Sequence, residues 1–253
     1  MRWYTKLILP IILIFVWEVL AILIGNEFIL PRIESVIEVL FRPLANIFGQ
    51  GSLVENSAVS VFRVLLGFVI GLLAAIPLGI FMGRSDALEE FVDPVIQVLR
   101  PIPPIAWLPL ALAWFKIGLA GIIFIIFIGA FFPVLINTID GVKRVSRTWI
   151  ETACTFGAKE AQILSKVVVP AAMPDIWTGL RVGFGIAWMS VVAAEMLPGT
   201  SSGLGFLILF GLNIGQLQVT IAGMIVIGLI GLGIDYLMKR VEMRYFGWKG
   251  LEK

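Results

Sequence analysis

The chain has 253 residues, of which 59% are hydrophobic and 14% charged, and its mean hydropathy is +1.01. Soluble domains are about 45–50% apolar and about 25% charged, so this composition predicts a chain solvated mainly by lipid. The net charge of +2, without a basic stripe, argues against nucleic-acid binding. The sequence has no histidine, a single cysteine (Cys154) and no G-x-x-x-x-G-K-[ST] loop. We therefore expect no metal, no internal disulfide and no cofactor, ATP included.

Apolar runs of membrane-spanning length recur along the chain. A span needs roughly 20 residues, and the runs of about this length are 7–24, 57–83, 91–115, 119–139, 176–197 and 217–238. The first follows Arg2 and Lys6 but lacks a small-x-small cleavage site, so we interpret it as an uncleaved membrane helix. The prolines of 101–109 interrupt the third, either as a packed kink or as the lining of a water-filled path. The predicted fold class is an all-α membrane protein with about six transmembrane helices.

The connections between these runs differ in polarity. Segment 31–55 carries Ile33, Val36, Ile37 and Leu40 at helical spacing, which predicts an amphipathic helix on the membrane surface. Segment 198–215 has no charge, and its glycine- and serine-rich part, 199–205, fits either an external turn or a re-entrant loop closing the pathway. Lys and Arg concentrate before the first run, in 140–175 and after the last run. With six spans these segments share one side, so both termini are expected in the cytoplasm.

The polar segment 146–170 has the pattern of two short helices. Ser146 is a plausible N-cap, and Gly157 can adopt the left-handed conformation that ends the first helix. Pro170 is expected to stop the second helix. Each predicted helix has one apolar face, which suits docking into a partner's groove. The alternative is an ordinary amphipathic cytoplasmic loop.

This segment resembles the cytoplasmic signature of ABC import permeases. In that signature E-A-A is followed by a glycine and, nine residues later, by I-x-L-P. The chain has Glu151-Thr152-Ala153, Gly157 at the expected spacing and Val167-x-Val169-Pro170. It departs at Thr152, where the pattern has alanine, and by substitutions to valine. The resemblance implies that the segment couples to an ATPase subunit through Glu151, Ala153, Phe156, Gly157, Ala158 and Pro170.

Other segments resemble the nitrate, sulfonate and taurine branch of these permeases. They are 63–68, 99–104, 179–181 with 187–188, 194–196 and 201–205. The resemblance implies a type I ABC importer permease fold in the cytoplasmic membrane, a homodimer, an ATP-binding ATPase dimer and an extracytoplasmic substrate-binding protein. The implied cargo is a small oxyanion such as nitrate, sulfonate, taurine or bicarbonate, with a vitamin precursor as the alternative. An ion-coupled secondary transporter would need an internal repeat and ion-coupling carboxylates, and neither is evident here. A membrane enzyme would need convergent groups such as histidines or paired carboxylates, and the sequence has no histidine and no evident carboxylate pair.

We divide the chain into an N-terminal helix with its surface segment (1–56), a core transmembrane domain (57–240) with coupling helices at 146–169, and a cytoplasmic tail (241–253). Candidates for the pathway or its gate are Arg63, Arg100, Arg181, Glu195, Ser201, Ser202, Gly203 and Gly205. An arginine at helix-centre depth costs about 2.5–3.5 kcal/mol on insertion scales, so each should face the bundle interior, a partner or water. The alternative is structural: the arginines pair with Glu195 or cap backbone carbonyls, and Glu195 is a solvated carboxylate near a span end. Small residues four apart, such as Gly67/Gly71, Gly79/Gly83 and Gly179/Gly183, predict close helix packing.

Overall fold

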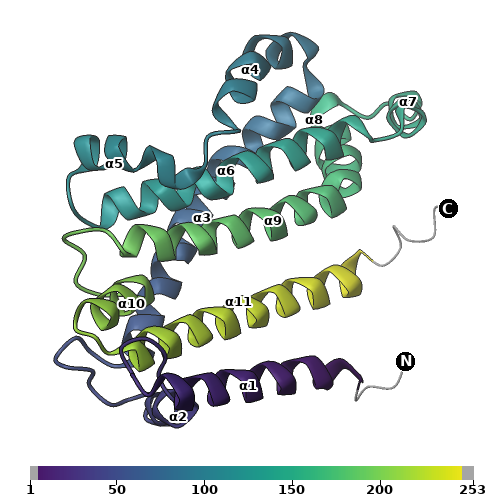
Figure 1. The fold of residues 1–253 in the computed structure, drawn as a ribbon. Helices are drawn as coiled ribbons and strands as arrows, with labels where there is room; N and C mark the ends of the chain where they lie inside the picture. Colours follow the sequence, from purple (N-terminus) through teal and green to yellow (C-terminus); the bar gives the residue numbers. More distant parts are fainter. Residues whose placement is uncertain (1–4, 247–253) are drawn as a thin grey trace. The chain divides into compact units, whose positions relative to one another are not determined.

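The structure, a computed structural model, describes residues 5–246, and side chains from Ile8 onward. Within that range the secondary structure is helical (Figure 1). In chain order the elements are α1 (Thr5–Ile24), α2 (Ile33–Phe41), α3 (Leu53–Arg84), α4 (Asp86–Leu99), the 3₁₀ turn η1 (Pro104–Trp107), α5 (Leu108–Phe115), α6 (Leu119–Lys143), α7 (Arg147–Thr155), α8 (Glu160–Ile163), the π turn η2 (Leu164–Val168), α9 (Val169–Glu195), α10 (Leu204–Asn213) and α11 (Leu217–Tyr245). The end of the predicted tail, 247–253, and Arg2 lie outside the described residues.

The helices long and apolar enough to cross a membrane agree with a multi-pass protein. Four qualify: α3, α6, α11 and the continuous stretch Glu160–Glu195. A fifth span forms if α4 is counted with the segment Pro104–Phe115, which meets it at a bend of 90°. This bend is the interruption predicted from the prolines, because Pro101 and Pro103 have no N–H to continue a helix. The first predicted span corresponds to α1, whose apolar part Ile8–Ile24 falls among the shorter helices.

The chain forms two compact units. Unit 1 comprises Met1–Ser60 and Glu195–Ile230, and unit 2 comprises Val61–Ala194 and Gly231–Lys253. In unit 1, the Glu18 carboxylate accepts a hydrogen bond from the Ile33 amide at 3.1 Å and so caps the start of α2. The amphipathic helix predicted within 31–55 is present as α2, but it is shorter than expected. It ends at Phe41 because the residue before Pro43 is disfavoured in the helical conformation.

Apart from Glu18, the described side chains of helix α1 leave it without a charged face. Phe15 is 68% exposed and Leu23 is 75% exposed, with similar values for most of their neighbours. A helix without a polar face is solvated by lipid or by other apolar helices. This pattern supports the interpretation of 7–24 as a membrane helix.

Small residues join α6 to its neighbours in unit 2. A Cβ added at Gly79 of α3 would lie 2.7 Å from the Thr138 Cβ on α6. A Cβ at Gly179 of α9 would lie 2.7 Å from the Asn137 Cβ and 3.2 Å from the Pro133 carbonyl oxygen. Gly67, Gly71, Gly83 and Gly183 make equivalent approaches to α6. The predicted small-residue packing is confirmed, and it brings the three helix backbones close together (Figure 1).

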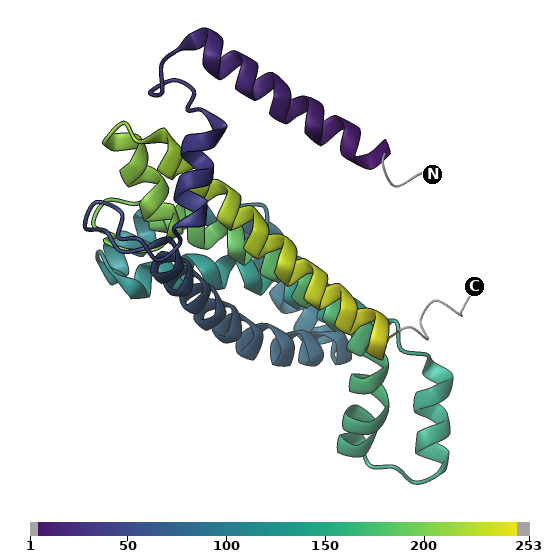
Figure 2. The same cartoon turned by 90° about the horizontal axis from the view of Figure 1, so that it is seen from below.

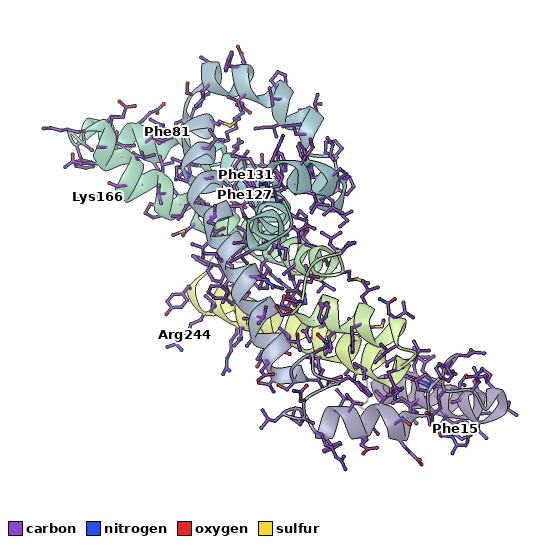
Figure 3. All side chains as sticks on the ribbon, turned by 90° about the vertical axis from the view of Figure 1, so that its left-hand side faces the viewer. Phe15, Phe81, Phe127, Phe131, Lys166 and Arg244 are labelled. Atoms are coloured by element: carbon purple, nitrogen blue, oxygen red, sulfur yellow. The ribbon has the colours of Figure 1, made fainter. Side chains whose placement is uncertain are left out.

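Helix α6 carries a run of aromatic rings that pack against the buried cluster of unit 2. Phe127 and Phe131 lie one turn apart and stack, with their ring centroids 5.3 Å apart (Figure 3). Phe131 also meets Phe132 edge to face at 5.3 Å. These three phenylalanines of α6 therefore pack against one another.

We expect Gly179→Ala to lower the stability of the purified protein by about 1–3 kcal/mol, because the new methyl group meets backbone atoms of α6 that cannot rotate away. Thermal unfolding in detergent measures this. The control is Gly185→Ala on the same helix, where no atom lies within 4 Å of the added Cβ. An equal loss in both variants would contradict close packing at Gly179.

Candidate functional site

The turn between α7 and α8 has the geometry of a helix stop. Gly157 has a φ of +77°. Its amide donates to the Cys154 carbonyl at 2.8 Å, and the Ala158 amide donates to the Ala153 carbonyl at 3.0 Å. The second bond spans five residues, as in a Schellman motif. The predicted left-handed glycine is confirmed, and Ser146 occupies the N-cap position of α7 without a side-chain hydrogen bond.

The helix after this turn is longer than expected. The prediction that Pro170 stops it is wrong, because α8, η2 and α9 form one stretch from Glu160 to Glu195. Residues Leu164–Val168 form a π turn directly before the proline. The wider turn shifts the hydrogen-bond register where Pro170 lacks a donor, so the chain continues into α9.

The helix pair has an anchored side and an open side. Ala153 and Ala158 pack against a buried cluster of unit 2 that includes Val145, Ile163 and Val168. On the open side Phe156 is 87% exposed, and Glu151 is exposed as well. A groove of about 520 Å³ is lined by Trp149, Thr152, Ala153, Phe156, Lys166, Val167, Pro170 and Ala171. Figure 2 shows α7 and the α8 segment as a projecting hairpin.

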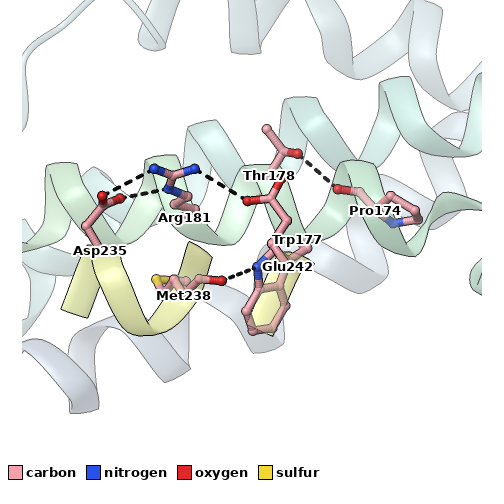
Figure 4. A network of polar contacts seen from close by, with 7 residues as sticks. All are labelled: Pro174, Trp177, Thr178, Arg181, Asp235, Met238 and Glu242. Atoms are coloured by element: carbon pink, nitrogen blue, oxygen red, sulfur yellow. Dashed lines mark hydrogen bonds and ion pairs between the residues drawn. The ribbon is translucent and has the colours of Figure 1, made fainter. Parts of the chain in front are cut away.

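Arg181 is held by two carboxylates in unit 2 (Figure 4). Its Nε lies 2.7 Å from Asp235 Oδ1 and its Nη2 lies 3.2 Å from Asp235 Oδ2, which is a bidentate arrangement. Its Nη1 lies 3.4 Å from Glu242 Oε2. Beside it the Trp177 indole donates to the Met238 carbonyl at 3.1 Å. These contacts join α9 to α11 and neutralise the charge of Arg181 within the protein.

Arg100 lies where α4 ends, next to Pro101. Its amide donates to the Ile96 carbonyl at 2.8 Å, and its side chain borders a cavity in unit 2. Across residues 5–246, no carboxylate lies within 4.0 Å of its guanidinium, unlike that of Arg181. Arg63, the third candidate arginine, is partly buried in α3.

Two of the remaining pathway candidates, Gly203 and Gly205, lie against Glu195 in unit 1. This carboxylate is fully buried, so the expectation of a solvated carboxylate is wrong. Its Oε2 accepts hydrogen bonds from Ser60 Oγ at 2.7 Å and from the Gly205 amide at 3.1 Å. The Leu204 amide donates to Ser60 Oγ at 2.8 Å, and the Gly203 amide donates to Asn56 Oδ1 at 2.7 Å. The three side chains therefore satisfy the first amides of α10, whose dipole favours a negative charge at this end.

Helix α10 was not expected from the sequence. Ser201 and Ser202 lie in the turn before it, Ser201 exposed and Ser202 partly buried, and Gly203 has a φ of +109°. Ser60 and Asn56 were missed as well. Their only signal is that they are polar residues on the first turns of an apolar helix.

Residues 67–247 match the family of binding-protein-dependent transport system inner membrane components. The chain belongs to this family. A permease of this kind is a transport protein and not an enzyme, and the apolar helices agree with its place in the membrane.

Several named permeases are similar over nearly the full length. An ABC transporter permease of Methanocaldococcus jannaschii, whose name specifies no cargo, is 54% identical over 98% of this chain and 93% of its own length. The taurine transport system permease of Escherichia coli K12 is 35% identical over 96% of this chain and 88% of its own. A nitrate import permease of Synechocystis is 35% identical over 91% of this chain and 85% of its own.

The fold of the permease is also similar to that of a solved structure. A chain of a methionine ABC transporter in inward-facing conformations superposes with a TM-score of 0.65 at 17% identity. The match covers 74% of the permease and 92% of that chain. The type I importer fold predicted from the sequence is thereby confirmed.

Proposed function

We propose that this permease forms the membrane passage of an ABC importer for a small oxyanion and is driven by a separate ATPase subunit. The observation that carries the proposal is the helix pair α7–α8. Its Gly157 turn is defined by hydrogen bonds, its base packs into unit 2, and its open side presents Phe156 beside an apolar groove. An exposed aromatic side chain next to a groove suits an interface hot spot.

The ATPase binds ATP and docks on this pair through Glu151, Phe156 and Gly157. The side that carries Lys143, Arg144, Lys159 and Lys166 is then cytoplasmic, and both termini lie there. A second copy of the permease completes the passage, and an extracytoplasmic binding protein delivers the cargo. The taurine and nitrate relatives support an oxyanion as that cargo.

Co-expression of the permease with its cognate ATPase tests the proposal. The two should co-purify, and Phe156→Asp should lower recovery of the ATPase at least tenfold, because a carboxylate cannot be buried in an apolar interface. Phe41→Asp is the matched control, since Phe41 is 83% exposed at the end of α2 and lies in unit 1. Purified alone, the permease should neither bind nor hydrolyse ATP. ATP turnover by the chain alone, or proton-driven uptake without the ATPase, would overturn the assignment.

A further inference from the structure

Unit 2 contains a cavity beside the middle of α6. Its volume is about 270 Å³, just below the roughly 300–1,000 Å³ typical of drug-sized ligands, so it suits a small solute. Most of its wall is apolar, formed by residues such as Ile128, Phe132 and Ile186. Its polar side chains are Arg100, at the end of α4, and Asn137, on α6. A few polar groups in an apolar wall are typical of a ligand site.

Arg100 supplies this cavity with an uncompensated positive charge. Within the described range 5–246, the basic residues Arg181, Arg144 and Lys143 each pair with a carboxylate, whereas Arg100 has no such partner. Arg100 is exposed at the end of α4, so its guanidinium is open to an incoming solute. Its planar fork can hold two oxygens of one anion at once. The cavity therefore favours an oxyanion.

The α6 wall of the same cavity supplies acceptors. Pro133 has no N–H, so it cannot provide the donor that the Gly129 carbonyl would receive in a regular helix. The Asn137 amide donates from Nδ2 to the Pro133 carbonyl at 2.8 Å. That bond orients the amide, and no donor of the described chain occupies Asn137 Oδ1. Nitrate has only acceptors and cannot bond the Gly129 carbonyl oxygen or Asn137 Oδ1. A cargo with an N–H or O–H group can donate a hydrogen bond to either oxygen.

We propose that this cavity is a transit site in the permease for a small oxyanion that carries its own hydrogen-bond donor, as an aminosulfonate does. The inference rests on the proposed import function and narrows its cargo. Arg100 binds the anionic end, and the acceptors of Gly129 and Asn137 bind the donor end. Binding is weak, because a transport site must release what it binds.

Ligand-observed NMR on the permease–ATPase complex in nanodiscs, without a binding protein, tests this. The probes are taurine, ethanesulfonate, which lacks the amine, and nitrate. Taurine should bind about tenfold more tightly than either of the others. Arg100→Gln should weaken the binding of taurine and of ethanesulfonate at least tenfold. Arg100→Lys, which keeps the charge, should weaken their binding less. Asn137→Leu should remove the preference for taurine while ethanesulfonate binding stays. Arg144→Gln, a surface control paired with Asp175, should change nothing.

Equal binding of taurine and ethanesulfonate would overturn the proposal, as would unchanged binding in an intact Arg100→Gln complex. Loss of taurine binding in nanodiscs of anionic lipid would assign Arg100 to a lipid phosphate and would also overturn it. Failure of the permease and ATPase to form a complex would instead contradict the proposed function.

Discussion

Gly203→Ala is expected to prevent stable accumulation of the permease in the membrane. An added Cβ at Gly203 would overlap the carboxyl group of Glu195, which is fully buried and cannot move into solvent. The φ of +109° adds backbone strain for any residue with a side chain. Overpacking costs about 1–3 kcal/mol and the left-handed conformation adds roughly 1–2 kcal/mol, which together are a large part of the stability of most domains. Quantitative immunoblotting of membranes, followed by thermal unfolding of whatever protein remains, measures the effect.

Gly49→Ala is the matched control for this variant. Gly49 also has a positive φ, +83°, and belongs to the same unit, but no atom lies within 4 Å of an added Cβ. It therefore carries the backbone strain without the overlap. If both variants accumulated equally, the close approach of Gly203 to Glu195 would not be a requirement of the fold.

Gly157→Val is expected to lower uptake and recovery of the ATPase subunit at least tenfold while membrane levels stay near normal. Nothing lies within 4 Å of an added Cβ, so the substitution creates no clash, and its effect comes from the φ of +77°. A left-handed conformation costs an ordinary residue roughly 1–2 kcal/mol, and a β-branched residue resists it most. Because the turn is exposed, we expect the substitution to distort the helix pair and to leave the packing of the membrane helices unchanged.

Uptake in cells and pull-down of the ATPase measure this second effect. Gly157→Asn is the control, because asparagine tolerates the left-handed conformation and should retain most activity. Gly185→Val, on α9 with open space around it, should leave ATPase binding unchanged. Normal assembly and normal uptake in the valine variant would count against a docking role for this turn.

Local sequence made the Gly157 turn predictable and left the contacts of Glu195 hidden. Gly157 could be predicted because a glycine between two amphipathic runs has few other uses. The prediction for Pro170 was wrong because the π turn before it lets the helix continue although Pro170 has no N–H to donate. Such a turn has no recognisable sequence pattern. Glu195 was named as a candidate, but its contact with Ser60 could not be predicted, since the two are separated by 135 residues and only the folded chain brings them together. The same holds for Arg181, whose partner Asp235 lies 54 residues away.

The hydrogen bonds of Glu195 also set an order of events during synthesis. Ser60 and Asn56 leave the ribosome with the start of α3, but Glu195 and the amides of α10 follow roughly 135 residues later. At about 5–20 residues per second, the delay is roughly 7–27 s. During that interval the buried polar groups of α3 lack their native partners, and an unpaired polar group in hydrocarbon is costly. The start of α3 therefore stays at a watery interface or against the insertion machinery until α9 and α10 arrive.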